Sequence, residues 1–139
     1  MNALVITGGA YPDLEAVRHL VDSAGFIVAA DSGLETAIAY GIRPSIVVGD
    51  FDSLSDEGLL AEYDDASVRR FSTAKDLTDT ELALRVAREE GCERVHLVGG
   101  GGGRVDHLLA IAGLFERDRY PDLWVTDTSV IRAFDSELV

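Results

Sequence analysis

The chain has 139 residues, 47% of them hydrophobic and 27% charged, which is the composition of one ordinary globular domain with a sizeable core. Its 25 acidic and 12 basic side chains give a net charge of −13, which repels phosphate backbones and argues against nucleic acid as a partner. The single cysteine, Cys92, excludes an internal disulfide, and no apolar run approaches the roughly 20 residues that cross a bilayer, so we expect a cytoplasmic protein without a membrane partner.

Apolar runs alternate with stretches of helical periodicity along the whole chain. The runs predict strands at residues 3–7, 26–30, 45–48, 68–71, 94–98, 123–126 and 130–133. Helical spacing of apolar side chains predicts helices at about residues 12–24, 34–40, 55–65, 79–90 and 105–116, and we expect Gly25 to end the first of them. Strands that alternate with helices over short connections predict an α/β fold, with a doubly wound, mostly parallel, Rossmann-like sheet flanked by helices.

Polar and glycine-rich segments follow five of the predicted strands. These segments are residues 8–9, 31–33, 49–53, 75–79 and 99–107. In a doubly wound sheet, ligands bind outside the carboxyl ends of the strands. Because all five segments should lie at that edge, the sequence predicts a functional site there.

Asp50 and Asp52 alternate along an extended segment directly after the third predicted strand. Their carboxylates therefore point the same way, and two such charges repel each other unless a cation lies between them. Carboxylate oxygens are ligands that suit Mg²⁺, which makes the pair a candidate metal site. The alternative is an acidic turn in which Ser53 caps the next helix, and the local sequence does not decide between the two.

The segment around Thr78 has both a structural and a functional interpretation. Thr78 and Glu81 have the spacing of a capping box, and Asp79 in the first turn suits the helix dipole. Lys75 and Asp76 are not needed for capping. A lysine at the strand edge could pair with a phosphate, which leaves Asp76 or Asp79 as a metal ligand.

A run of five glycines, residues 99–103, leads into another predicted helix. Successive glycines let backbone N–H groups approach an anion, and the helix N-terminus adds its dipole. Arg104 could clamp a phosphate, while Asp106 and His107 could orient a substrate or a metal. The alternative interpretation is a flexible turn.

Together, four of these segments resemble the N-terminal catalytic domain of the thiamine pyrophosphokinases (thiamine diphosphokinases). That family has the patterns A-D-G-G, G-D-F-D-S, K-D-x-T-D-x-E and G-G-R-x-D-H, and residues 31–33, 49–53, 75–81 and 99–107 follow them in this order. Two positions depart from the patterns. Ser32 replaces a glycine, and Gly101 stands where many members have a threonine.

The resemblance implies Mg²⁺-dependent transfer of the pyrophosphoryl group from ATP to the hydroxyl of thiamine, giving thiamine diphosphate and AMP. It also implies a homodimer in which a C-terminal β-sandwich domain helps to bind thiamine. We expect the 139 residues to stop near the point where that domain would begin. We therefore expect residues 1–139 to form a single ATP-binding catalytic domain, whose last ten or so residues lead toward the missing one.

Residue roles carried over from the family fall into three groups. The carboxylates at the reacting phosphates are Asp31, Asp50, Asp52 and Asp79, of which Asp50, Asp52 and Asp79 would hold Mg²⁺. The groups around ATP are Ser53, Lys75, Asp76, Thr78, Gly102, Gly103 and Arg104. The acceptor would be surrounded by Asp31, Asp106 and His107. Asp31 and Asp52 are both candidates to take the hydroxyl proton.

Two other functions fit the same residues. Pyrophosphokinases that act on a hydroxymethyl pterin share the aspartate-rich strand edge, although the segments at 75–81 and 102–107 favour thiamine. A non-catalytic domain that binds a nucleotide or a metal is the alternative outside the enzymes.

Overall fold

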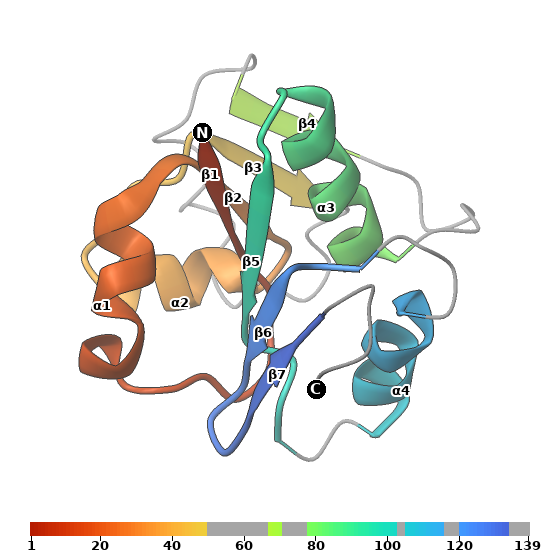
Figure 1. Ribbon diagram of the computed structural model, residues 1–139. Coiled ribbons are helices and arrows are strands. Elements are labelled where there is room, and N and C mark those ends of the chain that lie inside the picture. Colours follow the sequence, from red (N-terminus) through yellow and green to blue (C-terminus); the bar gives the residue numbers. More distant parts are fainter. Residues whose placement is uncertain (50–66, 71–77, 103–104, 116–119, 134–139) are drawn as a thin grey trace, which may run out of the picture.

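The computed structural model describes residues 1–49, 67–70, 78–102, 105–115 and 120–133. Seven strands form one sheet in the order β4-β3-β2-β1-β5-β6-β7 (Figure 1). Every neighbouring pair is parallel except β6 and β7, which are antiparallel. The prediction of a doubly wound, mostly parallel sheet is therefore confirmed. The strand order reverses direction between β1 and β5, where such sheets open a crevice for ligands.

Most of the predicted elements are present, with ends that move by one or two residues. The strands are β1 (Asn2–Ile6), β2 (Ala24–Ala30), β3 (Ile46–Gly49), β4 (Val68–Arg70), β5 (Arg94–Val98), β6 (Leu123–Val125) and β7 (Val130–Arg132). The helices are α1 (Leu14–Ser23), α2 (Gly33–Ala39), α3 (Asp79–Glu89) and α4 (Val105–Leu114). The helix predicted at 55–65 lies outside the described residues.

The largest difference concerns Gly25, which we expected to end the first helix. Instead, α1 ends at Ser23, and Gly25 is the second residue of β2. Asn2 of β1 pairs with Ala24, so β2 starts two residues earlier than its apolar run. The side chain of Met1 lies where a Cβ on Gly25 would be, with its Cγ only 2.6 Å from that position. Gly25 therefore makes room for the N-terminus and does not cap a helix.

Two hydrophobic layers hold the helices to the sheet, and alternate residues of each strand feed them. Val5 of β1 belongs to the layer under α3 and α4, whereas Leu4 belongs to the layer under α1 and α2. Figure 1 shows the two pairs of helices on opposite sides of the sheet. Trp124 is buried in the first layer, and its Nε1–H donates to the carbonyl of Gly99, 2.8 Å away. The core thus fixes the loop that follows β5.

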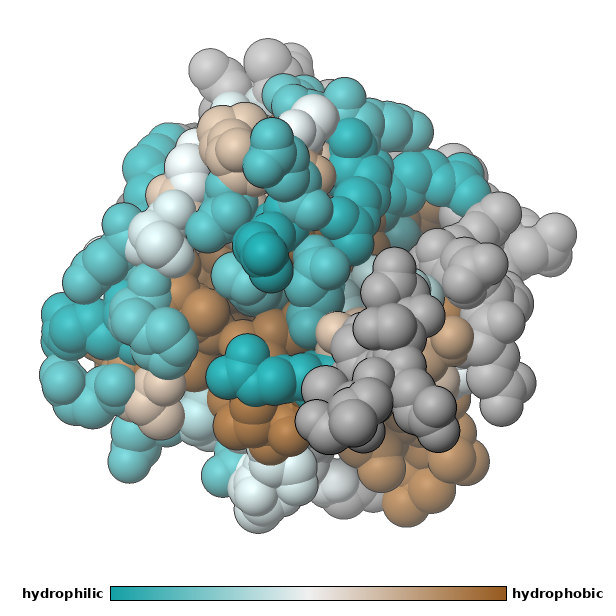
Figure 2. Space-filling view, in the orientation of Figure 1, coloured by the Kyte–Doolittle hydropathy of each residue, from teal (hydrophilic) through white to brown (hydrophobic). Residues whose placement is uncertain are grey.

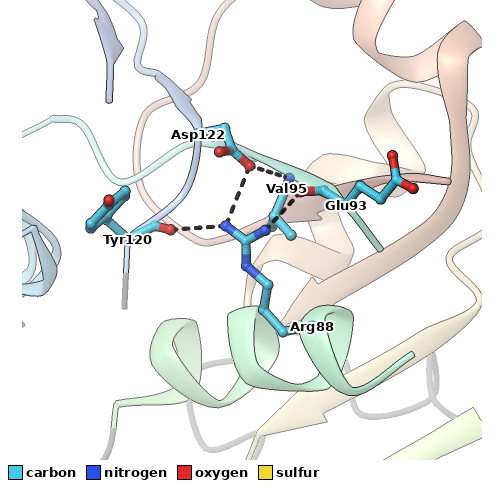
Figure 3. Close-up of polar contacts among 5 residues, drawn as sticks. All are labelled: Arg88, Glu93, Val95, Tyr120 and Asp122. Atoms are coloured by element: carbon cyan, nitrogen blue, oxygen red, sulfur yellow. Dashed lines mark hydrogen bonds and ion pairs between the residues drawn. The ribbon is translucent and has the colours of Figure 1, made fainter. Parts of the chain in front are cut away.

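Arg88 ties the end of α3 to the sheet (Figure 3). Its guanidinium donates to the carbonyls of Glu93 and Tyr120 at 3.1 and 3.3 Å and pairs with Asp122 at 3.3 Å. Asp122 also accepts a hydrogen bond of 2.8 Å from the backbone N–H of Val95. These contacts fix the direction of α3, whose opposite end reaches the carboxyl edge of the sheet.

The outer side of α4 is apolar as well as its inner side. Val105 and Leu109 are 62% and 63% exposed, and Figure 2 shows this apolar surface at the lower right, where Figure 1 places α4. Only Ile111 and Leu114 of this helix are buried. Within the described residues, no helix combines the length and the hydropathy needed to cross a membrane.

Tyr40 gives the fold a measurable response to alkaline pH. Its hydroxyl donates to the carbonyl of Pro12 at 2.5 Å, and its ring meets that of Tyr11 edge-on. Burial, with smaller contributions from Tyr11 and Asp13, raises the pKa of Tyr40 from 10.0 to about 12. A raised pKa stabilises the folded state below pH 10, and this contribution is lost as the pH rises from about 10 to about 12.

We therefore expect Tyr40→Phe to cost about 1 kcal/mol at neutral pH, the value of one buried hydrogen bond. The variant should also lose less stability than the wild type between pH 10 and pH 12. Urea unfolding at a series of pH values measures both effects. Parallel pH curves for the two proteins would contradict the assignment.

Candidate active site

A cleft of about 280 Å³ lies at the carboxyl edge of the sheet, beside the point where the strand order reverses. The loops after β1 and β2 and the first turns of α3 and α4 form its walls. The lining residues are Thr7, Gly8, Gly9, Ala30, Asp31, Ser32, Thr78, Asp79, Thr80, Asp106, His107 and Ala110. Five residues that the sequence singled out thus share one cleft, namely Asp31, Thr78, Asp79, Asp106 and His107.

Asp31 is held in an unusual backbone conformation at the end of β2. Its φ is +51°, and it is the only described residue other than glycine with a positive φ. Its N–H donates to the carbonyl of Val48 at 2.7 Å, and its carbonyl accepts from the N–H of Leu34 at 3.1 Å. A left-handed residue that is not glycine costs about 1 kcal/mol or more, so these contacts must hold it there. The backbone of Asp31 is therefore held in place where this residue lines the cleft.

Gly49, the last residue of β3, lies beside both Asp31 and Asp79. A Cβ on Gly49 would lie 3.3 Å from the Cβ of Asp31 and 3.3 Å from Oδ2 of Asp79. Because φ of Gly49 is +142°, a side chain would also strain the backbone there. The absence of a side chain therefore leaves space at the end of β3, and this space is bordered by Asp31 of one element and Asp79 of another.

Thr78 fixes the start of α3 and thereby the position of Asp79. The Thr78 side chain accepts a hydrogen bond of 3.1 Å from the N–H of Glu81, which confirms that half of the predicted capping box. Asp79 is the first residue of the helix and lines the cleft. Thr78 can therefore cap the helix while Asp79 contributes to a site, because the capped first turn of α3 lies at the cleft.

Three aspartates line the cleft, namely Asp31, Asp79 and Asp106, and His107 is the only residue among its described lining that can carry a positive charge. Such a wall favours a cation, and carboxylate oxygens are the donors that Mg²⁺ prefers. No group of three metal-binding side chains occurs within the part of the chain that the structure describes. Asp79 fits as one oxygen ligand, but it does not complete a site alone.

Seven predicted site residues lie outside the described residues. They are Asp50, Asp52, Ser53, Lys75, Asp76, Gly103 and Arg104. Of their described neighbours in the chain, Thr78 lines the cleft, and Gly49 lies beside Asp31 and Asp79, which both line it.

Gly102 does not line the cleft with the other predicted residues. It borders a second hollow of about 420 Å³ between α4 and the β6–β7 hairpin, together with Gly101, Trp124 and Asp127. The glycine loop nevertheless contacts the loop after β1, because the N–H of Ala10 donates to the carbonyl of Gly101 at 3.0 Å, and Gly8 and Gly9 of that loop line the cleft. We predicted that the glycine loop would lie at the same site as the other residues. Its described residues Gly101 and Gly102 instead line the second hollow.

The structure shows which atoms surround Ser32 and Gly101, the two departures from the family patterns. The side chain of Ser32 does not cap α2, and its Oγ lies 2.0 Å from the position that a Cβ on Gly8 would take. A Cβ on Gly101 would lie 2.3 Å from Oδ1 of Asp127. A threonine at position 101 would therefore need Asp127 to move, which gives a local reason for glycine here.

Sequence analysis missed Thr7 and Thr80. Their hydroxyls lie 2.6 Å apart in the wall of the cleft, and Thr80 Oγ1 lies 3.4 Å from Nε2 of His107. A threonine at a strand end and another in the first turn of a helix are ordinary in both places. Only the fold brings them together, across 73 positions of sequence.

Comparisons with known proteins agree with this arrangement. Residues 17–125 match the sequence model of a family described as "Thiamin pyrophosphokinase, catalytic domain". A thiamine pyrophosphokinase of Bacillus subtilis (strain 168) is 30% identical over 106 residues, which are 76% of this chain and 50% of that protein. The chain thus spans half the length of this curated relative.

Two crystal structures show the same fold. A thiamin pyrophosphokinase from Geobacillus thermodenitrificans has a TM-score of 0.71 and 31% identity, with 91% of this chain and 60% of that chain covered. A thiamin pyrophosphokinase family protein from Enterococcus faecalis has a TM-score of 0.77 and 26% identity, with 95% and 64% covered. In each of these two crystal structures, more than a third of the chain lies outside the part that this chain covers.

Proposed function

Because this chain belongs to the thiamin pyrophosphokinase family and contains the region of its catalytic domain, we propose that it transfers a pyrophosphoryl group from ATP to the hydroxyl of thiamine. The products are thiamine diphosphate and AMP. The observation that carries this proposal is the meeting of Asp31, Asp79, Asp106 and His107 in one cleft at the reversal point of the sheet.

The chemistry is an attack of the thiamine hydroxyl oxygen on the β-phosphorus of ATP, which breaks the bond to the α-phosphate. Catalysis of such a step consists mainly of alignment and neutralisation of charge. Asp31, rigidly held by its backbone contacts, is one candidate to accept the hydroxyl proton, and Asp52 is the other. Asp106 and His107, which line the cleft, would surround the acceptor in this proposal.

Magnesium fits this site through Asp79, with Asp50 and Asp52 as its further ligands in our proposal. When bound, Mg²⁺ would offset the charge of the β- and γ-phosphates. The chain itself has a net charge of −13, so polyphosphate needs such compensation. Lys75 and Arg104 would supply positive side chains, and Ser53, Asp76, Thr78, Gly102 and Gly103 would complete the surroundings of ATP.

The remaining expectations belong to the same proposal. Residues 1–139 act as one α/β catalytic domain, the protein works as a cytoplasmic homodimer, and nucleic acid and membranes are not its partners. The longer relatives contain additional chain that would contribute to the acceptor site.

The proposal is tested by measuring AMP release from Mg²⁺–ATP in parallel reactions with thiamine and with a hydroxymethyl pterin. We expect AMP only with thiamine, in equal amount to thiamine diphosphate. AMP only with the pterin would assign the chain to the alternative acceptor. The longer B. subtilis relative serves as the positive control for both reactions. If this chain binds ATP but releases no AMP in either reaction, a non-catalytic nucleotide-binding domain is favoured.

A further inference from the structure

Three polar side chains that are far apart in the sequence form one connected row in the wall of the cleft. Thr7 follows β1, Thr80 lies in the first turn of α3, and His107 lies in the first turn of α4. The two hydroxyl oxygens are 2.6 Å apart, and Thr80 Oγ1 is 3.4 Å from Nε2 of His107. Both threonines are only 2% exposed, so water does not easily replace these contacts.

The direction of the hydrogen bonds follows from counting protons. A hydroxyl has one proton to donate, and a buried donor that lacks an acceptor is costly. If Thr7 donates to Thr80 and Thr80 donates to Nε2 of His107, both hydroxyl protons are used. In the reverse direction, the proton of Thr7 needs another acceptor, and within the described residues its hydroxyl contacts only Thr80. The first direction is therefore favoured.

This direction has a consequence for the imidazole ring. A neutral histidine has a proton on one ring nitrogen, and the hydrogen bond at one nitrogen decides which nitrogen carries it. Because Nε2 accepts from Thr80, the proton of neutral His107 belongs on Nδ1. The same hydrogen bond restrains the ring, because it keeps Nε2 of His107 beside Thr80.

We propose that Thr80 is a positioning residue, which together with Thr7 holds His107 in one orientation and in the Nδ1–H tautomer. Its effect on turnover rests on the proposed function, in which His107 faces the acceptor. Its effect on the ring does not rest on that function. The two consequences can therefore be measured separately.

The ring is tested in the unliganded protein by ¹H–¹⁵N correlation of the His107 side chain at about pH 8, above the ordinary histidine pKa of about 6.5. We expect separate nitrogen shifts typical of the Nδ1–H tautomer in the wild type and in Thr80→Ser. In Thr80→Val, which keeps the shape and removes the hydroxyl, both shifts should move toward the average of a mixed population. Thr36→Val is the matched control, because Thr36 is a buried helical threonine that does not line the cleft.

An Nε2–H tautomer in the wild type would overturn the proposal, and this result requires no variant to fold. A pure Nδ1–H tautomer in folded Thr80→Val would overturn it as well. In turnover assays with thiamine, we expect kcat to fall about 10-fold in Thr80→Val, with serine restoring it to within about 2-fold. Wild-type protein that does not turn over thiamine would refute the proposed function and leave the tautomer result to decide the role of Thr80.

Discussion

Asp79→Asn is expected to lower kcat for pyrophosphoryl transfer about 1,000-fold, or ~4 kcal/mol in transition-state free energy. Asp79 lies at the start of α3, and its Oδ2 approaches the space above Gly49 beside Asp31. Asparagine has the same shape and removes only the charge that Mg²⁺–ATP would require. The fold should persist, because the cap of this helix is made by Thr78 and because a first-turn carboxylate contributes only about 0.5 kcal/mol.

Asp22→Asn is the matched control for this prediction. Asp22 is exposed on α1 and does not line the cleft, yet its replacement changes the net charge by the same amount. Turnover and Mg²⁺ dependence are measured together with urea unfolding for both variants. Full activity in folded Asp79→Asn would remove Asp79 from the proposed metal site, whereas an equal loss in Asp22→Asn would indicate a general electrostatic effect.

Gly33→Ala is expected to lower the free energy of unfolding by about 3 kcal/mol, at the upper end of overpacking effects. Gly33 begins α2 at the end of β2, and a Cβ there would lie 2.0 Å from the carbonyl oxygen of Ile6. The neighbouring atoms are the backbone of β1, so no flexible side chain can move aside. Either α2 or the end of β1 must shift, and Thr7 and Gly8 of the cleft follow directly after β1.

Gly113→Ala is the matched control, because among the described residues no atom outside the backbone of its own helix and its chain neighbours lies within 4 Å of a Cβ at that position of α4. Alanine in a helix is favoured over glycine by up to about 1 kcal/mol, so this variant should be as stable as the wild type or slightly more stable. Urea unfolding followed by the fluorescence of buried Trp124 measures both. A Gly33→Ala protein of wild-type stability would mean that α2 does not pack on β1 as closely as described.

The strands of the sheet could be predicted from the sequence because each depends on a local pattern. The cleft lies at the carboxyl edge, where the polar segments after the strands were expected. Arg94–Val98 was predicted without error, since an apolar run between turn residues specifies a buried strand. Gly25 was misjudged because its role depends on Met1, which precedes β1 and packs against Gly25 where β1 and β2 begin to pair. A glycine can stop a helix or make room for a neighbour, and only the tertiary structure distinguishes the two.

Within the site, the sequence identified the individual carboxylates but not their partners. Asp31 and Asp79 both border the space that Gly49 leaves at the end of β3, a relation that involves three elements. The contact between Thr7 and Thr80 is equally non-local. Such pairings arise when the sheet brings strand ends together, and neither residue carries a signal of its own.

The most direct test of the central claim is to follow the label of ATP marked with ³²P on its γ-phosphate during incubation with Mg²⁺ and thiamine. Attack on the β-phosphorus predicts that the label appears in thiamine diphosphate while AMP forms in equal amount. Label in inorganic phosphate together with ADP, or in a thiamine monophosphate, would place the attack at the γ-phosphorus. Either of those results would contradict pyrophosphoryl transfer by this cleft.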